Sequence, residues 1–65
     1  MGSHLYNKLR DILLSNGCYF HRQGKGSHEI WKNPTIGAVF PVATHIPSRH
    51  TANAILKQAG IKQKM

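Results

Sequence analysis

Residues 16–31 have the sequence NGCYFHRQGKGSHEIW, in which two strand-like segments flank a glycine-rich turn. Residues 18–22 alternate in character and contain Tyr and Phe, and residues 27–32 contain Ile and Trp, which favours two β-strands. The intervening residues 23–26 are typical of a tight turn, because glycine adopts backbone angles that other residues avoid. The segment therefore predicts a β-hairpin.

Amphipathic helices are predicted on both sides of this hairpin. The first spans residues 5–15 and ends at Asn16-Gly17, because glycine readily takes the left-handed conformation that terminates helices. The second begins after Ser48 as its N-cap and ends at Gly60. Apolar residues recur at helical spacing in both segments. The predicted buried faces are Leu5, Leu9, Ile12 and Leu13 in the first helix and Ala52, Ile55, Leu56 and Ala59 in the second.

A third strand is predicted over residues 36–42, after a break at Asn33-Pro34. Pro41 in this strand favours a sheet edge or a strand end. The element order is then helix, three strands, helix. Short connections favour an antiparallel meander with both helices on one face, an α+β fold of αβββα order whose other sheet face is open.

The length of 65 residues sets the domain organisation. A chain this short buries only about 60% of the surface that it exposes when unfolded, so we expect one domain over residues 1–65. Residues 1–4 fit a cloning-tag remnant, and His4 is therefore given no functional weight. Residues 62–65 are expected to be frayed.

The charge balance points to a polyanionic partner. Nine Lys and Arg residues against two acidic residues give a formal net charge of +7, and such an imbalance attracts nucleic acid first, with a membrane surface or an acidic protein as alternatives. No apolar run reaches the roughly 18 residues of a membrane-spanning helix. Cys18 is the only cysteine, which excludes an intramolecular disulfide and a multi-cysteine zinc site and suits a reducing compartment.

The hairpin turn gathers groups that bind phosphate. Glycine backbones can approach an anion closely, and Arg22 and Lys25 add positive charge and hydrogen-bond donors. A polar glycine-rich hairpin is also common as a solvated turn without function. The composition of the turn alone does not decide between these two interpretations.

The order of motifs is more specific. A short amphipathic helix precedes Gly-x-x-x-x-Arg-Gln-x-x-Gly-Ser-His, an aromatic residue three positions on, a strand with a proline, and Ile-Leu-Lys-Gln-Ala-Gly-Ile. The matching residues are Gly17, Arg22, Gln23, Gly26, Ser27, His28, Trp31, Pro41 and residues 55–61. In these motifs nearly the whole chain resembles the HicA family of toxin ribonucleases. The resemblance implies a double-stranded-RNA-binding-like fold, cleavage of single-stranded mRNA, and His28 as the catalytic residue.

The resemblance also implies partners and a location. It indicates a type II toxin–antitoxin system of the prokaryotic cytoplasm, in which a monomeric toxin is neutralised by a HicB-type antitoxin and joined to it in a hetero-oligomer. The predicted RNA contacts are Arg22, Lys25, Gly26, Ser27 and Lys32. A non-catalytic RNA-binding module of the same fold is the alternative. A DNA-binding antitoxin is disfavoured, because nothing resembles helix-turn-helix or ribbon readout.

One histidine is sufficient for RNA cleavage, because RNA contains its own nucleophile in the 2′-hydroxyl beside each phosphodiester. An imidazole exchanges protons near neutral pH, and general acid–base catalysis contributes roughly 10²–10⁴-fold. Arg22 or Lys25 would stabilise the charge that develops on the phosphate. The expected chemistry needs no metal and no cofactor.

The direction in which His28 points depends on strand parity. His28 shares a strand face with Ile30, whereas Glu29 and Trp31 share the other. Burial of Trp31 under the helices would turn His28 outward, and we favour this arrangement because Trp buries the larger apolar area. Burial of Ile30 would turn His28 inward, and the acidic Glu29 beside Trp31 is an argument for that alternative.

The remaining histidines of the chain are predicted to be surface residues without a role in chemistry. His21, His45 and His50 are of a type that commonly lies partly exposed. A zinc site is disfavoured because His45 and His50 are five residues apart rather than four, and no cysteine pair supports them.

Overall fold

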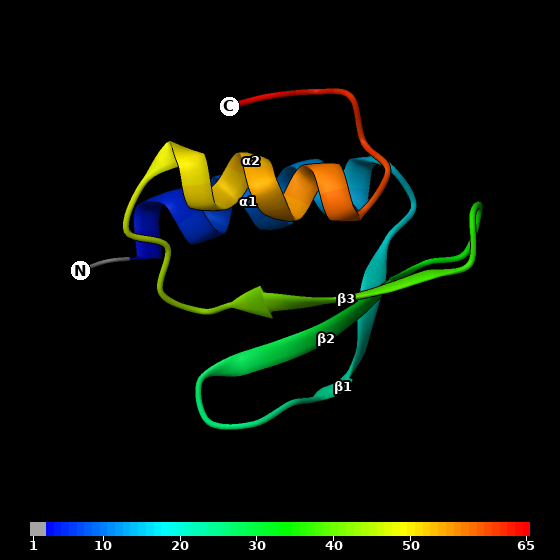
Figure 1. Ribbon diagram of the computed structural model, residues 1–65, viewed down its shortest axis with the longest axis horizontal. Coiled ribbons are helices and arrows are strands. Elements are labelled where there is room, and N and C mark those ends of the chain that lie inside the picture. The colour runs from blue at the N-terminus through cyan, green and yellow to red at the C-terminus, as the bar shows by residue number, and fades with distance from the viewer. Residues whose placement is uncertain (1–2) are drawn as a thin grey trace.

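The computed structural model describes residues 3–65, and Met1 and Gly2, part of the segment interpreted as a tag remnant, lie outside the described residues. The element order is α1 (Ser3–Ser15), β1 (Tyr19–Gln23), β2 (His28–Asn33), β3 (Ala38–Ala43) and α2 (Arg49–Gln58). The strands form one antiparallel sheet in the order β1-β2-β3. Both helices cover the same face of this sheet (Figure 1). The predicted α+β fold, a double-stranded-RNA-binding-like αβββα arrangement with one open sheet face, is therefore confirmed.

Several predicted element boundaries are wrong by one or two residues. Helix α1 begins at Ser3 rather than at residue 5. Cys18 is not a strand residue: its backbone N–H donates to the Leu13 carbonyl at 3.0 Å and closes the end of α1, and its side chain is buried. Ile36 lies in the turn of residues 34–37 and is 57% exposed, so β3 starts two residues later than expected.

The hairpin boundaries are shifted by one residue. Gln23, predicted to lie in the turn, is the last residue of β1, and Ser27, predicted to open the returning strand, lies in the turn. Asn33 closes β2 instead of breaking it. Pro41 lies within β3, which pairs only with β2 and is therefore an edge strand, as the proline predicted.

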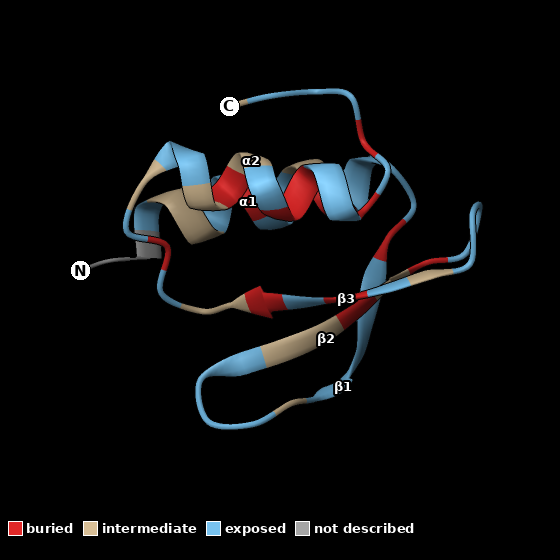
Figure 2. Cartoon of the chain, in the orientation of Figure 1, coloured by how far each residue is buried: buried red, intermediate tan, exposed pale blue. Residues whose placement is uncertain are grey.

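The core lies between the helix layer and the covered face of the sheet (Figure 2). The helical faces predicted from periodicity are confirmed, because Leu9, Leu13 and Leu56 are fully buried and Leu5 and Ile12 are packed against the core. The sheet contributes three buried apolar side chains, Trp31, Phe40 and Val42. Burial of each large apolar side chain stabilises the fold by about 1.5–3 kcal/mol. The contacts between the helices and the covered face of the sheet therefore hold the sheet, including its uncovered face, in position.

Helix α2 is fixed at both ends. Ser48 is the N-cap, as predicted, and its side chain accepts a hydrogen bond from the Thr51 backbone N–H at 3.4 Å. After the C-cap residue Ala59, Gly60 adopts a φ of +78°, and the Ile61 N–H donates to the Leu56 carbonyl at 2.9 Å. The chain therefore turns sharply at the predicted position.

Two side-chain amides hold the elements that flank α2. The buried Asn33, at the end of β2, donates from Nδ2 to the Ala59 carbonyl at 2.8 Å and accepts from the Thr35 N–H through Oδ1 at 3.1 Å. The Met65 N–H donates to Asn53 Oδ1 at 2.8 Å. Residues 62–65, predicted to be frayed, form no helix or strand, but the hydrogen bond of Met65 joins them to α2.

Within residues 3–65, no helix is long and apolar enough to cross a membrane.

Candidate functional site

The two faces of β2 have opposite environments. Trp31 is only 3% exposed and Asn33 is buried, which places these residues and Glu29 on the side of the helices. His28, Ile30 and Lys32 alternate with them and point to the uncovered side, where His28 is exposed. The outward orientation of His28, favoured on the size of Trp31, is confirmed.

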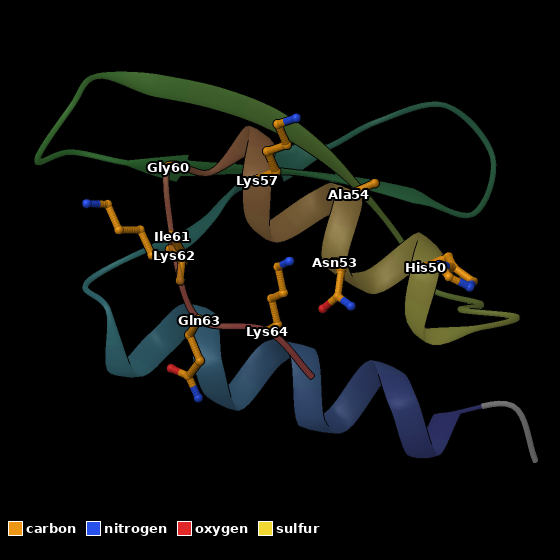
Figure 3. A pocket seen from close by; sticks show the side chains of 9 residues that line it. All are labelled: His50, Asn53, Ala54, Lys57, Gly60, Ile61, Lys62, Gln63 and Lys64. Atoms are coloured by element: carbon orange, nitrogen blue, oxygen red, sulfur yellow. The ribbon is translucent and has the colours of Figure 1, made fainter.

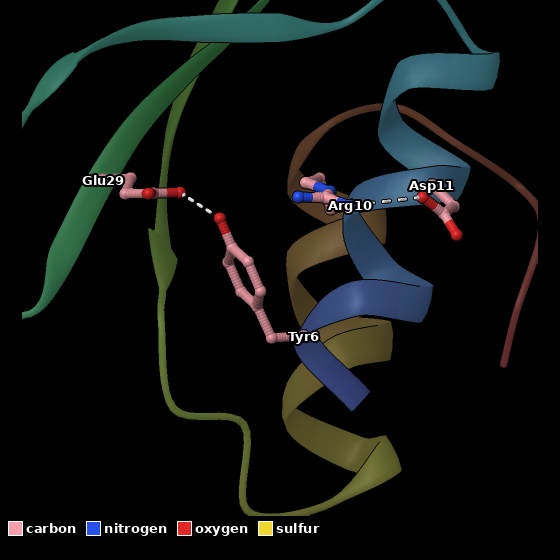
Figure 4. Close-up of polar contacts among 4 residues, drawn as sticks. All are labelled: Tyr6, Arg10, Asp11 and Glu29. Atoms are coloured by element: carbon pink, nitrogen blue, oxygen red, sulfur yellow. Dashed lines mark hydrogen bonds and ion pairs between the residues drawn. The ribbon is translucent and has the colours of Figure 1, made fainter. Parts of the chain in front are cut away.

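Glu29 lies on the helix side because two donors satisfy its carboxylate. Tyr6 Oη, from α1, donates to Glu29 Oε1 at 2.7 Å (Figure 4). Trp31 Nε1 donates to the same oxygen at 3.0 Å. Burial first, and then the hydrogen bond with Glu29, raises the pKa of Tyr6 from 10.0 to about 12. Glu29, which favoured the inward alternative for His28, is therefore hydrogen-bonded on the covered side of the sheet. The sequence analysis did not identify its partner Tyr6.

A β-bulge places Arg22 on the same side as His28. Phe20 pairs with Trp31, but the next aligned pair is Arg22 with Ile30, so His21 is an extra residue in β1. Residues directly opposite each other in an antiparallel pair point to the same face. Without the bulge, Arg22 would share the face of Phe20 and point away from His28. Arg22, a predicted RNA contact, therefore lies on the side of His28 only because of the bulge, which alternation along the strand does not predict.

The uncovered side of the sheet, here called the open face, combines cations with apolar groups. It consists of Tyr19, Arg22, His28, Ile30, Lys32, Val39, Pro41 and Ala43. Tyr19 and Val39 are 42% and 55% exposed, and both are aligned with Lys32. The ring of His21 lies edge-on to that of Tyr19, with centroids 6.4 Å apart. His28 is aligned with Ala43 and is exposed.

The open face contains no acidic side chain. The sequence has only two acids. Glu29 lies on the helix side, and Asp11 lies on α1, where its Oδ1 is 3.9 Å from Arg10 Nη2. Arg22 and Lys32 are therefore not neutralised by a carboxylate on their own face. Such a surface attracts phosphates.

The loop beside His28 is exposed and partly free to donate hydrogen bonds. The His28 N–H donates to the Lys25 carbonyl at 3.0 Å, which closes a turn with Gly26 at φ +55°. Lys25, Gly26 and Ser27 are all exposed. Their backbone N–H groups have no acceptor within residues 3–65, and donors of this kind bind anions. The predicted contact residues Lys25, Gly26 and Ser27 thus adjoin His28, and Lys32 lies four residues along the same strand.

A second cationic region lies on the far side of the molecule. His50 and Lys57 of α2 and Lys62 and Lys64 of the C-terminal tail are among the residues that line a hollow (Figure 3). We call this hollow the tail groove; the C-terminal tail that lines it runs on the side of the helix layer that faces away from the sheet (Figure 1). His21, His45 and His50 are exposed, as predicted. No cluster of three His, Cys, Asp or Glu side chains able to hold a metal occurs in the described part of the chain.

A comparison with protein-family models identifies the family to which the chain belongs. The model for the HicA toxin of bacterial toxin–antitoxin systems matches residues 6–61. The chain belongs to the HicA toxin family. The match includes the whole hairpin, so the Gly-Ser-His motif and the strands that orient it lie within the family region. Searches of curated proteins and of solved structures gave no match. As a HicA-family protein, the chain is a toxin whose partner is an antitoxin.

Proposed function

We propose that this HicA-family toxin is an endoribonuclease that cleaves single-stranded mRNA at the open face, with His28 as the general acid/base. One observation carries the proposal: His28 is exposed on a sheet face that holds cations and no acid. A histidine buried under the helices could not reach a substrate. The exposed imidazole is available to a phosphodiester that lies on the sheet.

The substrate supplies the other reacting group. His28 removes the proton of a 2′-hydroxyl, the oxygen attacks the adjacent phosphorus, and the bond to the 5′-oxygen of the next nucleotide breaks. A proton returned to that oxygen completes the step, so the imidazole can act first as base and then as acid. No metal or cofactor is needed for this balance. Cationic donors beside the phosphate stabilise its transient charge.

Binding of the RNA backbone is assigned to the groups around His28. Arg22, aligned with Ile30, and Lys32, four residues along β2, lie on the open face to one side of His28, and Lys25 with the free N–H groups of Gly26 and Ser27 lies at its loop end. These groups contact phosphates and sugars, which position the strand without reading its sequence. The exposed ring of Tyr19 offers a surface on which a base of single-stranded RNA can stack.

The antitoxin is proposed to be of the HicB type and to cover this face with an acidic surface. A net charge of +7 favours an anionic partner, and complementary charge accelerates association. The toxin monomer would then be held in a hetero-oligomer in the prokaryotic cytoplasm, where its mRNA substrate is found. Coverage of His28 would block cleavage without unfolding the toxin.

The test is incubation of the pure protein with single-stranded RNA in EDTA, in parallel with His28→Ala. The wild-type protein is expected to produce fragments, and the variant is expected to bind RNA without cutting it. Binding without fragments by the wild-type protein would show a non-catalytic RNA-binding module instead. Cleavage at the wild-type rate by folded His28→Ala would refute the assignment of His28.

A further inference from the structure

We propose that Gln23 and Thr44 are positioning residues that fix the backbone on both sides of His28. This inference rests on the proposed ribonuclease function. Neither side chain is assigned a contact with RNA. Both donate hydrogen bonds to carbonyl groups of the segment that carries the imidazole. They come from opposite neighbours of β2, Gln23 from the end of β1 and Thr44 from the residue after β3.

Thr44 holds the residue before His28. The Ser27 carbonyl oxygen accepts the Thr44 backbone N–H at 3.0 Å and the Thr44 Oγ1 hydroxyl at 2.8 Å. These two bonds extend the pairing of β2 with β3 by one residue beyond His28 and Ala43. The hydroxyl therefore adds a bond at the point where the regular ladder ends.

Gln23 holds the other side of the same peptide segment. Its Nε2 donates to the His28 carbonyl at 2.9 Å and to the Gly26 carbonyl at 3.3 Å. The His28 carbonyl also accepts the Gly24 N–H at 3.0 Å. A Cβ atom at Gly24 would lie 3.1 Å from that carbonyl oxygen, so the loop passes close to His28 and leaves little room for it to shift.

The location of these bonds separates positioning from fold stability. Gln23 is exposed and Thr44 is half-buried, and neither belongs to the core cluster. Loss of the two solvent-accessible hydrogen bonds of Gln23, or of the one from the Thr44 hydroxyl, changes global stability little. Reaction rates respond more steeply, because a displacement of about 1 Å at a reacting group can cost about 10²-fold. An effect on rate without an effect on folding is therefore expected.

The experiment compares Gln23→Met and Thr44→Val, which keep side-chain size but remove the donor, with wild type and His28→Ala. Gln58→Met and Thr35→Val are controls for the same substitutions, because both positions are exposed and their side chains make no hydrogen bond within residues 3–65. Single-turnover cleavage of single-stranded RNA is measured in EDTA as the maximal rate and the half-saturating protein concentration. Thermal unfolding is recorded for every variant.

Each donor-deleted variant is expected to lose about tenfold in maximal rate. The half-saturating concentration should stay within about twofold of wild type, since the phosphate contacts are intact. The two controls should match wild type in both quantities. An unchanged maximal rate in both donor-deleted variants would overturn the positioning role while the ribonuclease proposal stands. A loss explained by unfolded protein at the assay temperature would also overturn it. Absence of cleavage by wild type, or full activity of His28→Ala, would overturn the proposed function and this inference with it.

Discussion

The open face and the tail groove both place a histidine among cations, but on different scaffolds. His28 stands at the start of a strand whose two neighbours bond to the backbone around it. In the groove, Lys62 and Lys64 come from a tail without regular structure, which the Met65–Asn53 hydrogen bond joins to α2. Positive charge attracts RNA in either place. Chemistry needs reacting groups held in a defined geometry, and of the two histidines we propose that His28, with its hydrogen-bonded backbone, is the one held for it.

The largest expected difference between the two regions is in cleavage. His28→Ala should lower the cleavage rate by at least about 10²-fold, the lower end of general acid–base contributions. His50→Ala, its counterpart in the groove, should remain within about twofold of wild type. The rates are measured with RNA in excess, and folding is checked by circular dichroism. Equal losses in the two variants would remove the distinction between the regions.

The second prediction tests the hydrogen bond that joins the end of β2 to the C-terminal end of α2, a contact on which both regions depend. Asn33→Ala leaves the buried Ala59 carbonyl and the partly buried Thr35 N–H without their partner, so the free energy of unfolding should fall by about 1–3 kcal/mol. Asn7→Ala, at an exposed position of α1, should change it by less than about 0.5 kcal/mol. Urea titration measures both values. A small effect at Asn33 would show that this buried amide does not join the layers.

The sequence predicted those features of the fold that depend on residues close together in the chain. Helical periodicity gave the buried faces of α1 and α2, and the bulk of Trp31 gave the direction of His28. Both are properties of residues close together in the chain. The pairing of Tyr6 with Glu29 joins residues 23 positions apart, so no local pattern indicates it.

The bulge in β1 is a second feature that no local pattern shows. Simple alternation puts Arg22 on the side of Phe20, whereas the register puts it beside Ile30 on the open face. The predicted RNA contact at Arg22 relied on its motif and charge rather than on strand parity. The sequence does not indicate a role for Thr44 either, because its hydrogen bond to the Ser27 carbonyl exists only in the folded sheet.

The third prediction compares the charges of the two regions. If about four cations contact phosphates, the logarithm of the RNA association constant should fall with the logarithm of salt concentration at a slope of about −3. Arg22→Ala with Lys25→Ala should weaken binding about tenfold and reduce the slope to about −1.5. Lys62→Ala with Lys64→Ala should change affinity by less than about twofold. A stronger effect in the tail pair, measured by filter binding, would assign RNA to the groove.

The smallest expected effect concerns the covered side of β2, behind His28. The pKa of Tyr6 is raised to about 12 from an ordinary value of 10.0. The folded state therefore favours the protonated phenol, and this stabilisation is complete below pH 10 and declines as the pH rises toward 12. The stability advantage of wild type over Tyr6→Phe should be constant from pH 7 to about 9 and shrink above pH 10.

Urea unfolding at several pH values measures this difference. Tyr19→Phe, on the open face, is the control for changes that alkaline pH causes elsewhere in the chain. A gap between wild type and Tyr6→Phe that widens above pH 10 would contradict the sign of the Tyr6 shift.

The most direct test of RNA cleavage through the 2′-hydroxyl at His28 is the chemistry of the fragment ends. The proposed step leaves a 2′,3′-cyclic phosphate on one fragment and a 5′-hydroxyl on the other. Mass spectrometry of RNA cut in EDTA should find these ends, and a single 2′-deoxy nucleotide at the cut position should abolish that cut while binding persists. Fragments with 3′-hydroxyl and 5′-phosphate ends, or unimpaired cutting beside the 2′-deoxy nucleotide, would contradict the mechanism.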